Sequence, residues 1–241
     1  MIVTQVVDFL TDGANYGGQN GIITRLGQHV SYSVLSLVIA VLIALPVGAV
    51  IGHTGKGATA ILGAATALRA IPSLGLVLLL VSSFSISLTW LIITLVVLAV
   101  PPVMLGTLAG VSGVDPDLPD AARGVGMTEP QILLRVELPN ALPVIFGGIR
   151  TAMLQVVATV PIAALVAQGT LGQYIVDGLL QRDVPQVVAG AVLIALLAVL
   201  VDVALAGVQR LVVPTGLRLL AGPRRRSVLP RRGPARERTQ A

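Results

Sequence analysis

Long hydrophobic runs separated by short polar segments dominate this chain. A helix that crosses a bilayer needs about 20 apolar residues. Five runs meet that length, and they cover residues 30–51, 58–84, 88–111, 145–167 and 187–208. Pro46 should kink the first run, and Pro101 with Pro102 should break the third, because packing against neighbouring helices makes such prolines tolerable in a membrane. The pattern predicts an all-α, multi-pass transmembrane bundle with about five core spans.

The segment "DAARGVGMTEPQILLRVELP", residues 120–139, interrupts this pattern with charged and polar residues spread over twenty positions. Gly126 permits a sharp turn after a first short helix. Thr128 can then cap a second helix, with Gln131 as its capping-box partner, and Pro139 should stop it. The segment contains no nucleophile, metal cluster or phosphate cradle. A compact pair of short helices between two membrane spans has the shape of a docking element.

The composition agrees with a membrane protein. Hydrophobic residues make up 55% of the chain and charged residues 11%, against about 25% charged residues in soluble domains, and the mean hydropathy is +0.92. Cysteine is absent and His29 and His53 are the only histidines. Thiolate chemistry and multi-histidine metal sites are therefore excluded, and we expect neither a metal site nor catalytic residues.

Basic residues fix the expected topology, because they accumulate on the cytoplasmic side of a membrane. With five spans, thirteen basic residues fall on one side and only Arg25 and Arg182 on the other, while Arg69 stays inside a run. The larger set comprises Lys56, Arg123, Arg135, Arg150, Arg210, Arg218 and the seven arginines after residue 223. We therefore expect the N-terminus outside, and residues 120–139 and the C-terminus in the cytoplasm.

Three regions follow from this topology. Residues 1–29 form an extracytoplasmic N-terminal segment with a candidate interfacial helix, and residues 30–220 form the transmembrane domain, including the loop at 112–144. Residues 221–241 have the Pro, Arg and Gly content of a disordered tail. We expect this tail to contact anionic membrane lipid, and we expect no nucleic-acid partner.

The polar interruption resembles the cytoplasmic signature of ABC importer permeases. That signature is Glu-Ala-Ala, three residues, Gly, nine residues, Ile, one residue, Leu-Pro. The matching residues here are Asp120, Ala121, Ala122, Gly126, Val136, Leu138 and Pro139. The spacing agrees throughout, while Asp120, whose side chain is one methylene shorter, replaces Glu, and Val136 replaces Ile.

The resemblance implies a type I ABC importer permease fold in which these seven residues form a coupling helix. Its implied partners are a dimer of ATP-binding subunits, a second permease copy or a paralogue, and an extracytoplasmic substrate-binding protein. The implied location is the bacterial cytoplasmic (inner) membrane. This chain lacks the pattern G-x-x-x-x-G-K-[ST] that cradles nucleotide phosphates. ATP is therefore expected on the partner subunit, and no cofactor in this chain.

Residues 8–220 further resemble permeases for quaternary-ammonium osmoprotectants, through stretches such as "LRAIPSLGLVLLL", "RVELPNALPVIFGGIRTAM" and "QGTLGQYIVDGL". This resemblance implies import of glycine betaine, carnitine, choline or proline-like solutes. A permease for another small solute, such as an amino acid, taurine or nitrate, is the alternative. The aromatic residues are too scattered to form a cation-binding cage in one subunit, which agrees with selection by a separate binding protein.

A few residues are candidates for the translocation path or a gate. Arg69 either lines the path or is a structural residue at the membrane interface. Gly169, Gly172 and Tyr174 belong to "QGTLGQYI", which is either an outer gate and binding-protein contact or a plain glycine-rich turn. Asp202 is expected to make an interfacial or inter-helix polar contact.

Two other functional classes fit the sequence less well. An intramembrane enzyme needs a catalytic set within the spans, and Arg69 with Asp202 provides no His or Cys partner. A secondary transporter or channel would have ionisable coupling residues at mid-membrane and no cytoplasmic docking motif.

Overall fold

The computed structural model describes residues 2–84, 86–166 and 169–213, and among these residues every regular element is a helix. Four stretches are long and apolar enough to cross a membrane, and a bent helix pair raises the number to five if it counts as one span. The four contain α2 (Ile22–Thr54), α5 (Leu88–Ser112), α8 (Leu138–Thr159) and α10 (Val184–Val212). The predicted all-α bundle with about five spans is confirmed.

The second hydrophobic run differs from a simple span. It forms α3 (Ala58–Ala70) and α4 (Ser73–Ser83), which are bent by 76° relative to each other. Ile71 lies between them in an extended conformation, with φ −72° and ψ 121°. Because the ring of Pro72 disfavours helical backbone at the residue before it, the helix ends at this point.

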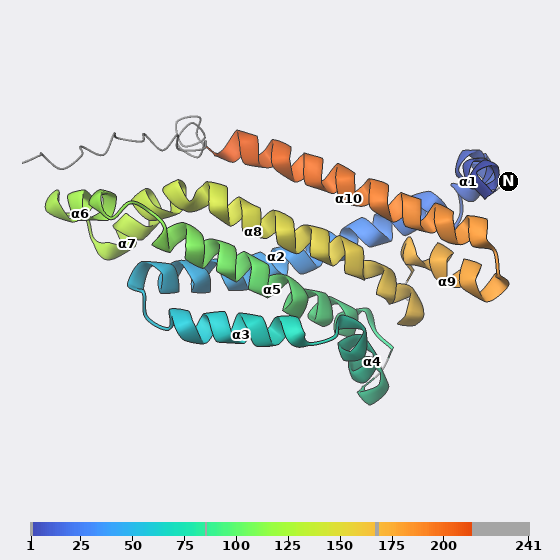
Figure 1. Cartoon of the computed structure of the whole chain (residues 1–241), viewed down its shortest axis with the longest axis horizontal. Helices are drawn as coiled ribbons and strands as arrows, with labels where there is room; N and C mark the ends of the chain where they lie inside the picture. The colour runs from blue at the N-terminus through green and yellow to red at the C-terminus, as the bar shows by residue number, and fades with distance from the viewer. Residues whose placement is uncertain (1, 85, 167–168, 214–241) are drawn as a thin grey trace, which may run out of the picture.

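Helix α5 lies between α2 and α8 and forms the centre of the bundle (Figure 1). Ala44 of α2, Leu95 of α5 and Val156 of α8 are fully buried in one shared core. Helix α10 packs on the outer side of α8, and its Leu196 and Leu200 are exposed. Exposed leucines of this kind are expected where a helix faces lipid rather than water.

The prolines inside the long helices do not interrupt them. Pro46 lies within α2, and Pro101 and Pro102 lie within α5, which remains continuous from Leu88 to Ser112. The predicted break of the third run is therefore wrong. Pro101 and Pro102 are buried, and contacts with neighbouring helices stabilise a helix through such positions.

The two ends of the bundle carry different short elements (Figure 1). Helices α6 (Asp117–Gly124) and α7 (Glu129–Ile132) lie at one end, and α9 (Gly172–Gln181) lies at the other. Helix α1 (Ile2–Thr11) lies crosswise at the end that holds α9 and contacts α10.

Two boundaries predicted from the sequence bear on these ends. Helix α2 begins at Ile22, inside the segment 1–29 that we expected to precede the first span. The predicted tail, residues 221–241, lies outside the described residues.

Glycines bring the central helices into backbone contact. A Cβ added to Gly106 of α5 would lie 2.8 Å from the Cα of Gly148 of α8. A Cβ on Gly148 would lie 2.6 Å from the carbonyl oxygen of Pro102. On α2, a Cβ on Gly48 would lie 2.9 Å from the carbonyl oxygen of Met104. Small residues of this kind allow close helix packing in membranes, where van der Waals contact replaces the hydrophobic effect between helices.

Because the backbones of α5 and α8 touch at Gly148, adding a single methyl group there should lower the stability of the protein. We expect Gly148→Ala to lower the stability of the detergent-solubilised protein by about 1–3 kcal/mol, because the backbones must separate. Gly147→Ala is the matched control, since a Cβ there meets nothing within 4 Å, and it should be neutral or slightly stabilising. Thermal unfolding of both variants measures the difference, and equal midpoints would contradict the packing role.

Candidate functional site

The polar interruption folds as the predicted pair of short helices. Helix α6 ends at Gly124, and Gly126 adopts the left-handed conformation with φ +86°, which favours glycine. The backbone N–H of Thr128 then donates to Oε1 of Gln131 at 2.9 Å, and the capping box forms. The predicted helix pair, glycine turn and cap are confirmed.

The end of the second helix is different from the prediction. The chain passes from α7 through a π-helical turn, η2 (Leu133–Glu137), directly into α8. Pro139 does not stop the helix but is the second residue of α8. Proline is tolerated in a first turn. The π turn is closed by a bond from the N–H of Leu138 to the carbonyl of Leu133, so the wider backbone continues into α8.

The seven signature residues divide into two groups. Asp120, Ala121 and Gly126 are exposed at the end of the bundle. The remaining four are buried or half-buried, and they are Ala122, Val136, Leu138 and Pro139. Leu138 packs against a small core that includes Val111 of α5 and Ile145 of α8. One part of the signature therefore faces outwards, and the other attaches the element to the helices.

Exposed apolar side chains surround the outward-facing group. Leu118, Val125 and Leu134 are 44%, 80% and 64% exposed. They belong to α6, the glycine turn and the π turn, which is the end of the bundle that carries the two short helices (Figure 1). An exposed apolar set beside charged residues is typical of a protein interaction surface.

An ion-pair network joins α6 to α7. Arg123 donates from Nε to Oε1 of Glu129 at 2.8 Å and from one terminal nitrogen to Oδ1 of Asp120, also at 2.8 Å. The hydrogen bond with Glu129, with a smaller contribution from Asp120, raises the pKa of Arg123 further above its ordinary value. Arg123 thus stays charged and forms an exposed ion pair with the signature residue Asp120.

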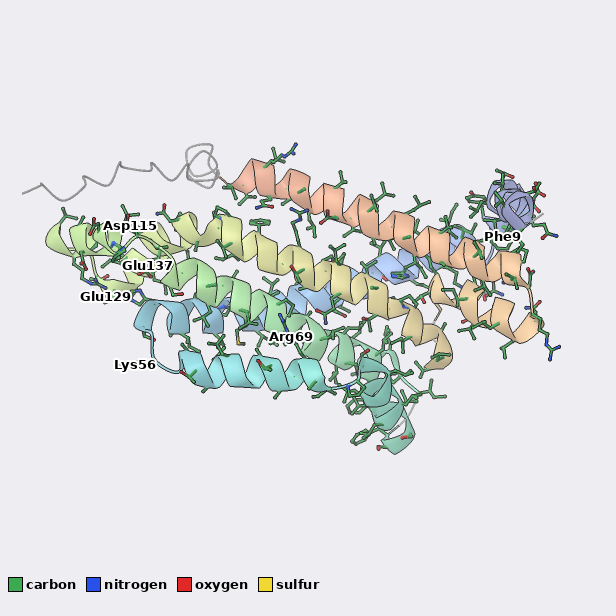
Figure 2. All side chains as sticks on the ribbon, in the orientation of Figure 1. Phe9, Lys56, Arg69, Asp115, Glu129 and Glu137 are labelled. Atoms are coloured by element: carbon green, nitrogen blue, oxygen red, sulfur yellow. The ribbon has the colours of Figure 1, made fainter. Side chains whose placement is uncertain are left out.

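A second polar contact at this end was not anticipated from the sequence. Nδ1 of His53, in the last turn of α2, lies 2.6 Å from Oε2 of Glu137, and its Nε2 lies 3.1 Å from Oε2 of Glu129. Figure 2 shows both glutamates at the end of the bundle that carries α6 and α7. His53 and Glu137 are 84 residues apart in the sequence, so no local pattern could reveal their contact.

At the opposite end, Tyr174 anchors the N-terminal segment. Its hydroxyl donates to the carbonyl of Asn20 at 2.8 Å, and its ring contacts Phe9 edge to face, with ring centroids 5.6 Å apart. Burial raises the pKa of Tyr174, so the hydroxyl keeps its proton. Phe9, Tyr174, Asn15 and Gln186 line part of an open hollow of about 380 Å³.

The two candidate glycines lie near this anchor. A Cβ on Gly172 would collide with the backbone of Pro161, in the 3-10 turn η3 (Val160–Val166) that follows α8. A Cβ on Gly169 would collide with the side chains of Arg25 and Gln28 of α2. The structure therefore brings Gly169, Gly172 and Tyr174 to the same end of the bundle, where both glycines serve close packing.

Arg69 is separate from that group. It is an exposed residue in the last turn of α3, just before the bend at Ile71. Figure 2 shows Arg69 far from Phe9 along the length of the bundle. The four candidates for a path or gate thus do not form one site.

Arg150 and Asp202 form an ion pair between α8 and α10. The guanidinium of Arg150 donates to both oxygens of Asp202 at 2.8–3.0 Å and to Oε1 of Gln209, about two turns further along α10, at 3.5 Å. The inter-helix contact expected for Asp202 is confirmed. Arg150, grouped above with the cytoplasmic residues, lies well inside α8 instead. A charge within a spanning helix is tolerated when it is paired in this way.

Among residues 2–84, 86–166 and 169–213, no group of three or more His, Cys, Asp or Glu side chains could hold a metal ion.

Comparison with known proteins identifies the family. Residues 36–215 match the family described as the binding-protein-dependent transport system inner membrane component, and the chain belongs to it. It is 35% identical over 217 residues to the osmoprotectant import permease protein OsmW of Salmonella typhimurium, covering 88% of this chain and 99% of that protein. It is 30% identical over 215 residues to the glycine betaine/carnitine/choline transport system permease protein OpuCB of Bacillus subtilis, and the match covers 89% of this chain and 97% of that protein.

Solved structures of ABC importers share the fold. An inward-facing MetNI methionine ABC transporter matches with a TM-score of 0.68 and 22% identity, covering 80% of this chain and 96% of that chain. An amino acid ABC transporter with histidines matches with a TM-score of 0.60 and 19% identity, covering 79% and 91%. The chain is therefore an inner-membrane permease component with the fold of ABC importer permeases.

The ion pair between α8 and α10 generates a quantitative prediction. Arg150→Met and Asp202→Leu should each destabilise the protein, because each leaves the other charge unpaired. The double variant should lose less than the sum of the two, with a coupling energy of about 1–2 kcal/mol. Unfolding in detergent for the wild type and the three variants measures this energy, and strict additivity would show that the pair is not coupled.

Proposed function

We propose that this chain forms half of the translocation path of an ATP-driven importer for quaternary-ammonium osmoprotectants. The observation that carries the proposal is the 30–35% identity, over nearly the whole chain, to permeases named for osmoprotectants, glycine betaine, carnitine and choline. The other half of the path is a second copy or a paralogue. An extracytoplasmic binding protein selects the solute.

The helix pair α6–α7 docks on a separate ATP-binding subunit in this proposal. Asp120, Ala121 and Gly126 supply the exposed contact, and the apolar side chains of Leu118 and Val125 enlarge it. The packed signature residues Ala122, Val136, Leu138 and Pro139 attach the docking surface to the bundle. Nucleotide is bound by the partner, and this chain needs no cofactor of its own.

The attachment suits transmission of a movement. Helix α5 leads into α6 through residues 113–116, and α7 continues through the π turn into α8. Helices α5 and α8 are in backbone contact at Gly106 and Gly148. A displacement of the docking surface by the ATPase therefore moves α5 and α8 together, as in a rigid-body transition.

The proposed orientation has α6 and α7 in the cytoplasm and α1 and α9 outside, within the bacterial inner membrane. It rests on the basic residues, which are concentrated on the side of α6 and α7 and in the C-terminal tail. In this orientation the N-terminus is outside, the C-terminus is cytoplasmic, and the segment around Gly169, Gly172 and Tyr174 faces the binding protein.

The substrate class is tested with the assembled complex in proteoliposomes. With the cognate ATPase and binding protein, we expect ATP-dependent uptake of glycine betaine, carnitine or choline, and little uptake of methionine, taurine or nitrate. Titration of the isolated binding protein with the same solutes should rank their affinities in the same order as their uptake. A preference for one of the latter three solutes would instead support the alternative, a permease for another small solute.

If α6 and α7 dock on the ATPase, the turn at Gly126 is required for ATP-dependent uptake. We expect Gly126→Val to reduce ATP-dependent uptake at least tenfold without preventing membrane insertion, because a non-glycine residue in the left-handed region costs about 1–2 kcal/mol and distorts the turn.

Gly124→Val is the matched control for this variant, since Gly124 ends α6 without a positive φ and a Cβ there meets nothing within 4 Å. It should retain most of the uptake. Equal uptake by the two variants would refute the requirement for the turn.

A further inference from the structure

His53 lies between two carboxylates that belong to the docking element. Its Nδ1 lies 2.6 Å from Glu137 of the π turn, and its Nε2 lies 3.1 Å from Glu129 of α7. The side chains of His53 and Glu137 are only 11% and 8% exposed. The family signature leaves the position between Val136 and Leu138 open, and it does not extend to His53, so the signature assigns neither residue a role.

Each ring nitrogen of His53 faces a carboxylate from a different segment of the docking element. Among the described residues, the side chain within ion-pair distance of Glu137 is that of His53. A buried carboxylate without a polar partner is strongly unfavourable, so the contact with His53 keeps Glu137 in its position.

The contact extends to the exposed signature residue. Glu129 bonds His53 on one side and Arg123 on the other, and Arg123 bonds Asp120. A continuous series of side-chain contacts thus runs from the end of α2 to the docking surface. It supplements the covalent links, which join the docking element only to α5 and α8.

We propose that His53 is a positioning residue that fixes the docking element to the inner end of α2. Without it, the element is still joined to the bundle by residues 113–116, by the π turn and by apolar contacts that include those of Leu133 and Leu138. The contact with α2 adds a third attachment, so that a displacement of the element reaches α2 as well as α5 and α8. This inference rests on the proposed function, because it specifies how the same docking element transmits movement.

The first experiment measures solute imported per ATP hydrolysed by the complete complex in proteoliposomes. We expect His53→Ala and Glu137→Gln to lower this ratio about tenfold while binding-protein-stimulated ATP hydrolysis continues. His53→Lys should restore the ratio, because the lysine ammonium can donate to the carboxylate of Glu137. Lys56→Ala is the control for a nearby cation and should leave the ratio unchanged.

A neutral double variant separates the loss of the contact from the loss of a partner for the buried carboxylate. His53→Gln with Glu137→Gln keeps side chains of similar size that can hydrogen-bond without charge, and it should give a higher ratio than His53→Ala. A ratio as low as that of His53→Ala in this variant, or a failure of His53→Lys to restore the ratio, would overturn the proposal.

The second experiment needs only the permease. Since the chain contains no cysteine, spin labels on Lys56→Cys and Asp117→Cys report the distance between the end of α2 and α6. We expect one narrow distance distribution with His53 present and a broad one with His53→Ala. An unchanged distribution would refute the positioning role, whereas an absence of ATP-driven uptake by the wild-type complex would refute the proposed function instead.

Discussion

Close contact between the backbones of α2, α5 and α8 is the constraint on which the rest of the structure depends. The acyl chains of the lipid are as apolar as the side chains, so the hydrophobic effect does not drive helices together within a membrane. Helices associate there through close packing and polar contacts. Gly48, Gly106 and Gly148 remove the side chains that would keep these helices apart. The resulting contacts join the three helices into one packed unit.

The two ends are attached to this unit in different ways. At one end, the docking element is joined to α5 and α8 by the chain itself and to α2 by the contacts of His53. At the other, the N-terminal segment is held by Tyr174, through Phe9 and the carbonyl of Asn20. In the proposed importer, the first attachment receives movement from the ATPase, and the second forms the side that meets the binding protein.

The sequence was sufficient for features determined by local chemistry. Hydropathy predicted the spans, and the glycine at position 126 and the Thr128–Gln131 pair predicted the turn and the cap. Features that depend on distant residues were missed. Neighbouring helices keep α5 continuous through Pro101, and the π turn carries the chain past Pro139.

The polar contacts follow the same division. His53 and Glu137 meet across 84 residues, and Arg150 and Asp202 across 52. A single sequence contains no signal for such pairs. The close approach of Gly169 to α2 and that of Gly172 to the 3-10 turn likewise cannot be predicted from the sequence alone.

The most direct test of the account is a cross-link from the docking surface. Because the chain has no cysteine of its own, Ala121→Cys places a unique thiol on exposed α6, and Leu180→Cys places one at the opposite end, where Leu180 is 79% exposed. In membranes that contain the full complex, the account predicts that the thiol at position 121 forms a cross-link with the ATP-binding subunit and that the thiol at position 180 does not. Labelling of position 121 by a membrane-impermeant reagent added from outside, without a cross-link to the ATPase, would contradict it.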